Sequence, residues 1–258
     1  MIKSMMEVYA YRSMLWSMIL SDLRTRYKGS VLGFLWTFMN PLLMLLVYML
    51  VFSTVMRIRI PNYAVYLFIG LLAWNVFANS VQSASSVIVR QASMVKKIYF
   101  PRAILPLAVV GGSVMNYLFS LAILIPLLLM FGYYPSLSWL LLVVILFIET
   151  LFTAGVALLV SSVNVYFRDV EHVLSIFMMM WFYITPVVYP ITMVPHRMGQ
   201  LFKLNPMTAL IYSFQSIFYY EQPIHWKLFV YAIVVSCLVF VIGWQVFQRL
   251  SRRFAEEV

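Results

Sequence analysis

Long apolar stretches separated by short polar loops run through most of this chain. Most of them reach the roughly 20 residues that an α-helix needs to cross a hydrocarbon core about 30 Å thick. Helices satisfy their own backbone hydrogen bonds inside lipid, so the pattern predicts an all-α polytopic membrane protein with a single transmembrane domain over residues 1–258. We expect six transmembrane helices, at residues 31–56, 63–88, 104–131, 139–163, 173–189 and 228–248.

Two segments outside the predicted spans have a pattern of their own. Residues 4–28 place polar and basic residues on one face and apolar residues on the other, which predicts an amphipathic interfacial helix at the membrane surface. It serves either as an anchor or as part of a coupling device. Between residues 186 and 223 lie five of the 11 prolines, and the apolar run among them is too short to cross. We therefore predict outer re-entrant helices over residues 191–220.

Basic residues are distributed unevenly on the two sides of the predicted spans. Cytoplasmic loops retain Lys and Arg, so the richer side is predicted to be cytoplasmic and to carry both termini. The poorer side has only Arg57, Arg59, Arg197, Lys203 and Lys227. The richer side comprises the two tails, the second loop and the fourth loop, with Lys3, Arg12, Arg24, Arg26, Lys28, Arg90, Lys96, Lys97, Arg102, Arg168, Arg249, Arg252 and Arg253.

Composition supports the membrane class. The chain is 64% hydrophobic and 10% charged, which excludes an ordinary soluble domain. A net charge of +10 is also typical of nucleic-acid-binding proteins, but here the charges flank apolar spans, where anionic lipid headgroups explain them better. We therefore expect membrane lipids, and no nucleic acid, as partners. The single cysteine, Cys237, excludes a disulfide within the chain.

The sequence has few groups that suggest chemistry. It has no G-x-x-x-x-G-K-[ST] loop for a nucleotide, no His or Cys cluster with metal spacing and no local signature of a nucleophilic enzyme. We expect neither catalysis nor a cofactor or metal bound by this chain. Glu149 is the one acid inside a predicted span. It is either a functional group facing a cavity or an acid hydrogen-bonded to a neighbouring helix.

Two predicted cytoplasmic loops mix charge with apolar side chains. Residues 90–102 alternate basic residues with others such as Met94, Ile98 and Tyr99. Exposed apolar groups rimmed by charge favour a protein docking surface, with anchoring in the lipid interface as the alternative. In the loop of residues 164–172, Asp169 either suits the positive end of the following helix or contributes to docking.

Aromatic and polar residues inside the spans allow two interpretations each. Aromatic rings can pack against sugar rings along a transport path, or they can simply face lipid. The polar residues between Asn75 and Ser86 in the second span either pack against other helices or form a channel wall. Pro41 removes one helix hydrogen bond, so we expect a kink in the first span.

Four motifs resemble, in the same order, those of the permease subunits of type-two ABC exporters for cell-surface polysaccharides. This family exports wall teichoic acid, O-antigen and capsule. The resemblance extends from about residue 20 to residue 215. The motifs are Arg26-Tyr-Lys-Gly-Ser-Val-Leu-Gly-Phe-Leu-Trp36 followed by Asn40-Pro41, Lys96-Lys-Ile-Tyr-Phe-Pro-Arg102 followed by Leu105-Pro106, Asn164-Val-Tyr-Phe-Arg-Asp169, and Leu204-Asn-Pro-Met207.

The resemblance implies a non-enzymatic transport permease in the bacterial cytoplasmic membrane. It implies a homodimer with six spans per subunit, joined to two copies of a separate ATPase that binds ATP and Mg²⁺. The substrate would be a polymer on a polyprenyl diphosphate lipid, with wall teichoic acid favoured and O-antigen or capsular polysaccharide next. The role of ATPase coupling carries over onto Met94, Val95, Lys96, Lys97, Ile98, Tyr99, Phe100, Arg102, Arg168 and Asp169.

Charge and aromaticity indicate candidates for the substrate path. Basic groups near the first span would attract the diphosphate, and rings or an acid within the spans would line the path. These candidates are Arg24, Arg26, Lys28, Trp36, Trp74, Phe77, Glu149, Trp181 and Tyr183. Two other functions are compatible with the sequence: an ABC exporter of drugs or small lipids, and an ATP-independent carrier or channel that uses Glu149.

Overall fold

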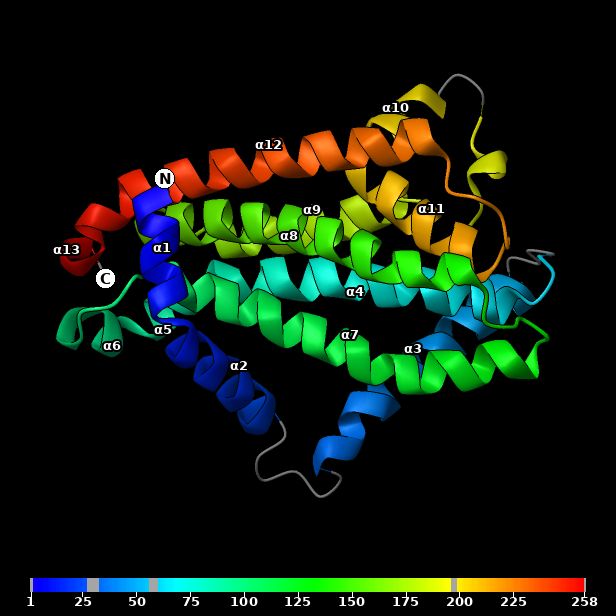
Figure 1. Cartoon of the computed structure of the whole chain (residues 1–258), viewed down its shortest axis with the longest axis horizontal. Helices are drawn as coiled ribbons and strands as arrows, with labels where there is room; N and C mark the ends of the chain where they lie inside the picture. Colours follow the sequence, from blue (N-terminus) through cyan, green and yellow to red (C-terminus); the bar gives the residue numbers. More distant parts are fainter. Residues whose placement is uncertain (1, 27–32, 56–59, 196–198, 258) are drawn as a thin grey trace.

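The computed structural model describes residues 2–26, 33–55, 60–195 and 199–257. Every regular element in these residues is a helix, which confirms the predicted all-α class. Most of the long helices run roughly along the long axis of the molecule and pack side by side as a bundle (Figure 1).

Four helices of the described residues are long and apolar enough to cross a membrane. They coincide with the predicted second, third, fourth and sixth spans. They are α4 (Tyr63–Ser85), α7 (Ile104–Met130), α8 (Leu141–Tyr166) with the 3₁₀ turn η3 (Leu137–Leu140) before it, and α12 (Trp226–Leu250) with the 3₁₀ turn η5 (Ser251–Arg253) after it.

Two shorter apolar helices occupy the places of the predicted first and fifth spans. The first is α3 (Trp36–Met49), which is preceded by the 3₁₀ turn η1 (Gly33–Leu35) and continues into the π-helix η2 (Leu50–Val55). The other is α9 (Val170–Ile184), which ends where Thr185 takes extended backbone before Pro186. Its 15 residues extend about 22 Å, less than the hydrocarbon thickness. Four of the six predicted spans therefore have the expected length.

Helix α4 lies at the centre of the bundle. In the apolar 18-residue stretch of α4, 78% is buried inside the protein, compared with 28% in the corresponding stretches of α7 and α12. It packs against α3, α7, α8, α9 and α11 (Pro206–Phe218). By contrast, α12 exposes Val230, Val234, Leu238 and Ile242 at every fourth position, as a helix facing lipid would.

Both termini lie at the same end of the bundle (Figure 1). The helices α1 (Ile2–Ala10), α5 (Val87–Arg90), α6 (Ala92–Lys97) and α13 (Phe254–Glu257) are at this end as well. The opposite end holds α10 (Gly199–Leu204), α11 and the turn after α7. Termini on a common side agree with the charge pattern, and the assignment of that side to the cytoplasm stays a prediction.

The predicted interfacial helix of residues 4–28 consists of two helices. Helix α1 ends at Ala10, and α2 (Arg12–Arg26) packs against α7. The contact depends on Gly111, because a Cβ atom there would lie 2.5 Å from the Cδ1 atom of Ile19, which is buried. Apolar side chains of α2 are thus used for packing against α7, and the placement of α1 and α2 at a membrane surface stays a prediction.

Asn205 joins α9 to α11 at the end opposite to the termini. Its Oδ1 atom accepts hydrogen bonds from the backbone N–H of Met207 (3.0 Å) and from Nε1 of Trp181 (2.9 Å), and its Nδ2 atom donates to Oγ1 of Thr185 (2.8 Å). Pro206 occupies the first turn of α11, where no backbone donor is required. The Leu204–Met207 motif therefore has a structural explanation. The pair α10 and α11 lies where re-entrant helices were predicted, and its depth in a membrane stays a prediction.

Helices α8 and α12 approach closely at two glycines. A Cβ atom on Gly155 would lie 2.7 Å from the Cα atom of Phe240, and one on Gly243 would collide with the carbonyl oxygen of Gly155. We expect Gly155→Ala to force the helices apart and to destabilise the fold by about 1–3 kcal/mol. The measurement is the apparent Tm of the detergent-purified protein.

Gly199→Ala is the matched control for this prediction, because a Cβ atom at Gly199 has nothing within 4 Å. An equal Tm for Gly155→Ala and Gly199→Ala would contradict the close α8–α12 contact.

Candidate functional site

The loop between α5 and α7 divides its apolar residues into two groups. Val95 and Phe100 are buried in a hydrophobic cluster that also contains Phe247 and Phe254, near the termini. Ile98 is 55% exposed and Tyr99 is 91% exposed. From the sequence, all four residues were predicted to belong to one docking surface. The structure instead gives them two roles, with Val95 and Phe100 fixing the loop while Ile98 and Tyr99 project from it.

The same loop is tied to the end of α12. The guanidinium of Arg102 donates a hydrogen bond to the carbonyl oxygen of Ser251, and the hydroxyl of Tyr166 donates to that of Leu250 at 2.9 Å. Phe254 is fully buried, with its ring centroid 5.5 Å from that of Phe247. These contacts join the loop before α7 with α8, α12 and α13 at one end of the bundle.

An open groove of about 440 Å³ lies beside this loop. Its walls come from α1, from the loop before α7 and from the end of α12. The lining residues include Glu7, Tyr11, Tyr99, Arg102 and Arg252. Aromatic, apolar and charged groups of both signs meet here, a composition suited to a protein partner. Met94 is half-buried, while Lys96 and Lys97 are exposed on the same surface.

Arg168 and Asp169 are exposed in the turn between α8 and α9. Asp169 occupies the position before α9, yet its side chain makes no capping hydrogen bond. The side chain of Asn164 makes a hydrogen bond at the start of α9 instead: its Oδ1 atom accepts from the backbone N–H of Glu171 at 3.2 Å. The hydrogen bond at the start of α9 is thus made by Asn164, whereas the exposed carboxylate of Asp169 lies at the positive end of the helix, and its part in docking stays a prediction.

An aromatic groove of about 370 Å³ lies between α3, α4 and α9. Trp74 and Tyr183, two of the predicted path residues, line it together with Tyr48 and Phe182. The ring of Phe182 packs edge-on against Trp74, with the centroids 5.5 Å apart. The groove therefore offers ring faces and edges within the depth of the bundle.

Phe77 and Trp181 occupy the packed interior. Phe77 is fully buried, and its ring centroid lies 5.0 Å from that of Trp181 and 5.4 Å from that of Phe152. Trp181 is half-buried and bonded to Asn205. These contacts assign both side chains to helix packing between α4, α8 and α9.

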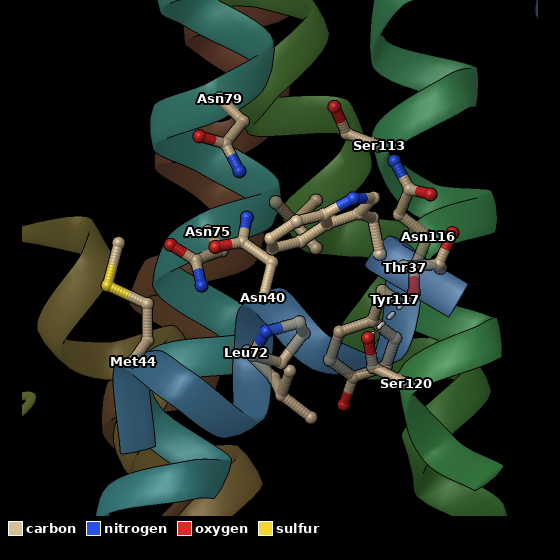
Figure 2. A pocket seen from close by; sticks show the side chains of 13 residues that line it. Thr37, Asn40, Met44, Leu72, Asn75, Asn79, Ser113, Asn116, Tyr117 and Ser120 are labelled. Atoms are coloured by element: carbon tan, nitrogen blue, oxygen red, sulfur yellow. Dashed lines mark hydrogen bonds between the residues drawn. The ribbon is translucent and has the colours of Figure 1, made fainter. Parts of the chain in front are cut away.

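A polar pocket of about 130 Å³ lies between α3, α4 and α7 (Figure 2). Trp36, another predicted path residue, lines it. The pocket shares Met44 and Asn75 with the aromatic groove, so the two spaces adjoin. The polar lining consists of amides and hydroxyls, from Thr37, Asn40, Asn75, Asn79, Ser113, Asn116, Tyr117 and Ser120.

Several of these pocket residues were missed as site candidates in the sequence. Asn40 was considered only as part of the Asn40-Pro41 motif, and the polar residues of α7 were not considered. The signal was present, because Ser113, Asn116 and Ser120 recur at a spacing of three and four in an otherwise apolar helix.

Glu149 of α8 is fully buried, and neither carboxyl oxygen has a hydrogen-bond partner among the described residues. Tyr117 of α7 is close enough to interact with it electrostatically. No cluster of three or more His, Cys, Asp or Glu residues that could hold a metal occurs in the described part of the chain.

The basic residues predicted to attract a diphosphate are only partly described. Arg24 is exposed on α2. Lys28 and the side chain of Arg26 lie outside the described residues.

Comparison with known proteins identifies relatives along almost the whole chain. A family model for ABC-2 type transporters matches residues 13–219. The chain is 35% identical over 260 aligned residues to the O-antigen export system permease protein RfbA of Myxococcus xanthus, and the alignment covers all of both chains. It is 34% identical over 236 residues to the protein of that name from Klebsiella pneumoniae, covering 91% of each chain. It is 23% identical over 203 residues to the polysialic acid transport protein KpsM of Escherichia coli, covering 76% of this chain and 77% of that one.

The burial of Glu149 leads to a prediction about stability. A buried carboxyl group without a hydrogen-bond partner destabilises the fold, so Glu149→Gln and Glu149→Leu should leave the apparent Tm unchanged or raise it. Thermal unfolding of the purified variants measures this directly. A decrease of more than about 2 kcal/mol in the free energy of unfolding of either variant would show instead that the carboxyl group has a stabilising partner.

Proposed function

The chain belongs to the ABC-2 type transporter family, and we propose that it is the permease subunit of an ATP-driven exporter of a cell-surface polysaccharide. The observation that carries the proposal is the match, over the full length of both chains, to a permease named for O-antigen export. A weaker match to a polysialic acid transport protein extends the substrate class to capsule-like polymers.

The relatives shift the preferred polymer. The sequence alone favoured wall teichoic acid, but the names of the relatives refer to O-antigen and to polysialic acid. We therefore place O-antigen or a capsular polysaccharide first. The polymer would be attached to a polyprenyl diphosphate lipid, and Arg24 together with the neighbouring basic residues would attract the diphosphate at the cytoplasmic surface.

The energy for export would come from a separate ATPase that binds ATP and Mg²⁺. We place its docking surface on Ile98 and Tyr99, with Arg168 and Asp169 as a second contact. This assignment is supported by the exposure of Ile98 and Tyr99 beside a groove at the end of the bundle that holds both termini. Two permease copies would bind two ATPase copies, with six spans in each permease.

The structure suggests how movement of the ATPase would reach the membrane. Force on Tyr99 would act on a loop whose neighbours Val95 and Phe100 are buried. The loop joins α4, through α5 and α6, to α7, and Arg102 links it to the end of α12. Coupling requires contacts that differ between two states, and this loop is where ATP-dependent contacts would change.

The two alternative functions have less support. Export of drugs or small lipids would share the ABC-2 family but not the substrates named for the relatives. An ATP-independent carrier would require Glu149 to exchange protons, and the structure encloses this side chain completely.

Deletion of the gene tests the proposed function. We expect the deletion strain to lack the long-chain polysaccharide on its surface and to accumulate lipid-linked polymer inside the cytoplasmic membrane. Immunoblots of intact and permeabilised cells separate the two locations. Normal surface polymer in the deletion strain would exclude the proposal.

Substitution of Ile98 and Tyr99 by Asp tests the docking surface. Two buried charges at the interface should weaken ATPase binding at least tenfold, while the permease still inserts. Copurification of the ATPase and the level of surface polymer are the measurements.

Tyr134→Asp is the matched control, because Tyr134 is 69% exposed and belongs to the turn after α7, which lies at the opposite end of the bundle. If the ATPase copurified equally with the variant that carries Asp at both 98 and 99 and with the Tyr134→Asp control, the docking surface would have to lie elsewhere.

A further inference from the structure

The polar pocket between α3, α4 and α7 is built from matching stripes on two helices. On α4, Leu72, Asn75, Val76 and Asn79 line it, and on α7, Ser113, Asn116, Tyr117 and Ser120 do. Both sets have the spacing i, i+3, i+4, i+7, which places each on one helix face. In Figure 2 Asn75 and Asn79 lie along α4 and Asn116 lies on α7, and the hydroxyl of Ser113 points from α7 towards the space between the two helices.

The pocket lies midway along both helices. Residues 72–79 are in the middle of α4, and residues 113–120 are in the middle of α7. Polar groups at such a depth are expensive unless they serve packing, a cavity or a substrate. In transporters, substrates commonly bind near the bilayer midplane, next to interrupted helices. Here the third wall is α3, which is short and contains Pro41.

Three polar atoms of the lining are buried without a hydrogen-bond partner among the described residues: Oγ1 of Thr37, Oγ of Ser113 and Oδ1 of Asn116. Thr37 and Ser113 are each only 4% exposed. Buried polar groups in folded proteins are nearly always satisfied, so these atoms indicate a polar occupant. The volume of about 130 Å³ is several times what one water molecule needs.

The side chains that line the pocket indicate which class of ligand it can bind. Amide and hydroxyl groups both donate and accept hydrogen bonds, as the hydroxyls of a sugar do, and Trp36 adds an aromatic ring. No Lys or Arg is among the described lining residues, so the pocket is unsuited to a diphosphate. An apolar drug or acyl chain would leave the polar atoms unpaired.

We propose that this pocket binds one uncharged sugar unit of the exported polymer. Neighbouring units would lie in the aromatic groove, which begins at the shared residues Met44 and Asn75 and presents Trp74 and Tyr183. The inference rests on the proposed function, because it names the part of the substrate that the bundle interior recognises. The diphosphate is recognised elsewhere, at the membrane surface.

The first experiment measures binding with purified permease in lipid nanodiscs. The probe is the oligosaccharide repeat released by mild acid from the surface polymer of the same bacterium, free of lipid and diphosphate. We expect Asn79→Leu and Asn116→Leu each to weaken binding about tenfold, because each removes hydrogen bonds at nearly constant size. Gln82→Leu is the control, since Gln82 is on α4 but is not among the residues that line the pocket.

A second measurement holds even where a leucine variant fails to fold. In a Cys237→Ala background, Asn79→Cys introduces one thiol at the pocket, at a position that is exposed in the structure. The oligosaccharide should slow maleimide labelling of this thiol, whereas inorganic pyrophosphate should not. Protection by pyrophosphate, or no protection by the oligosaccharide, would overturn the assignment.

The outcomes separate this inference from the proposed function. Unchanged oligosaccharide binding and normal export in Asn79→Leu and Asn116→Leu would overturn the sugar site and leave polysaccharide export intact. Normal surface polymer in the deletion strain would overturn both. Reduced binding and reduced export in these two variants, with Gln82→Leu unaffected and all apparent Tm values equal, would support the site.

Discussion

The burial of α4 at the centre of the bundle is the constraint on which the other features depend. Surrounded by α3, α7, α8, α9 and α11, this helix has contact with protein on most of its surface. At one end, the hydroxyls of Tyr63 and Tyr66 donate to the carbonyl oxygens of Val188 and Tyr189 and hold the segment after α9. In its middle it carries Asn75 and Asn79, and at the other end it continues into α5 and α6.

In our account, the two ends and the middle of the bundle have different functions, and α4 connects them. The end with both termini presents Ile98 and Tyr99 to an ATPase, and the middle offers an uncharged polar pocket beside an aromatic groove. At the far end, the hydrogen bonds of Asn205 link the end of α9 to the start of α11. Because α4 passes through all three levels, a displacement of the α6 loop would act on a helix that also lines the pocket. A polymer exporter needs such a link between ATP use and the substrate path.

Hydrophobic periodicity and charge were sufficient to predict the helical class, four full-length spans and termini on a common side. The predicted fifth span extends past the end of α9 at Ile184, because hydropathy averages over the local stop at Thr185-Pro186. The full length of the first span stays a prediction, since the described residues carry it as a helix from Gly33 to Val55. In the docking loop, composition could not separate the buried Phe100 from the adjacent, exposed Tyr99. The polar pocket depends on the register between α4 and α7, which a single sequence does not contain.

Single-cysteine labelling tests the central claim most directly, namely that the end with α6 and both termini faces the cytoplasm. In a Cys237→Ala background, Tyr99→Cys and Leu137→Cys place thiols at residues that are 91% and 86% exposed. Tyr99 follows α6, and Leu137 begins η3 just beyond the turn after α7, so the two belong to segments at opposite ends of the bundle. A membrane-impermeant maleimide added to spheroplasts should label position 137 and should reach position 99 only in inside-out vesicles. Labelling of position 99 in intact spheroplasts would contradict the account.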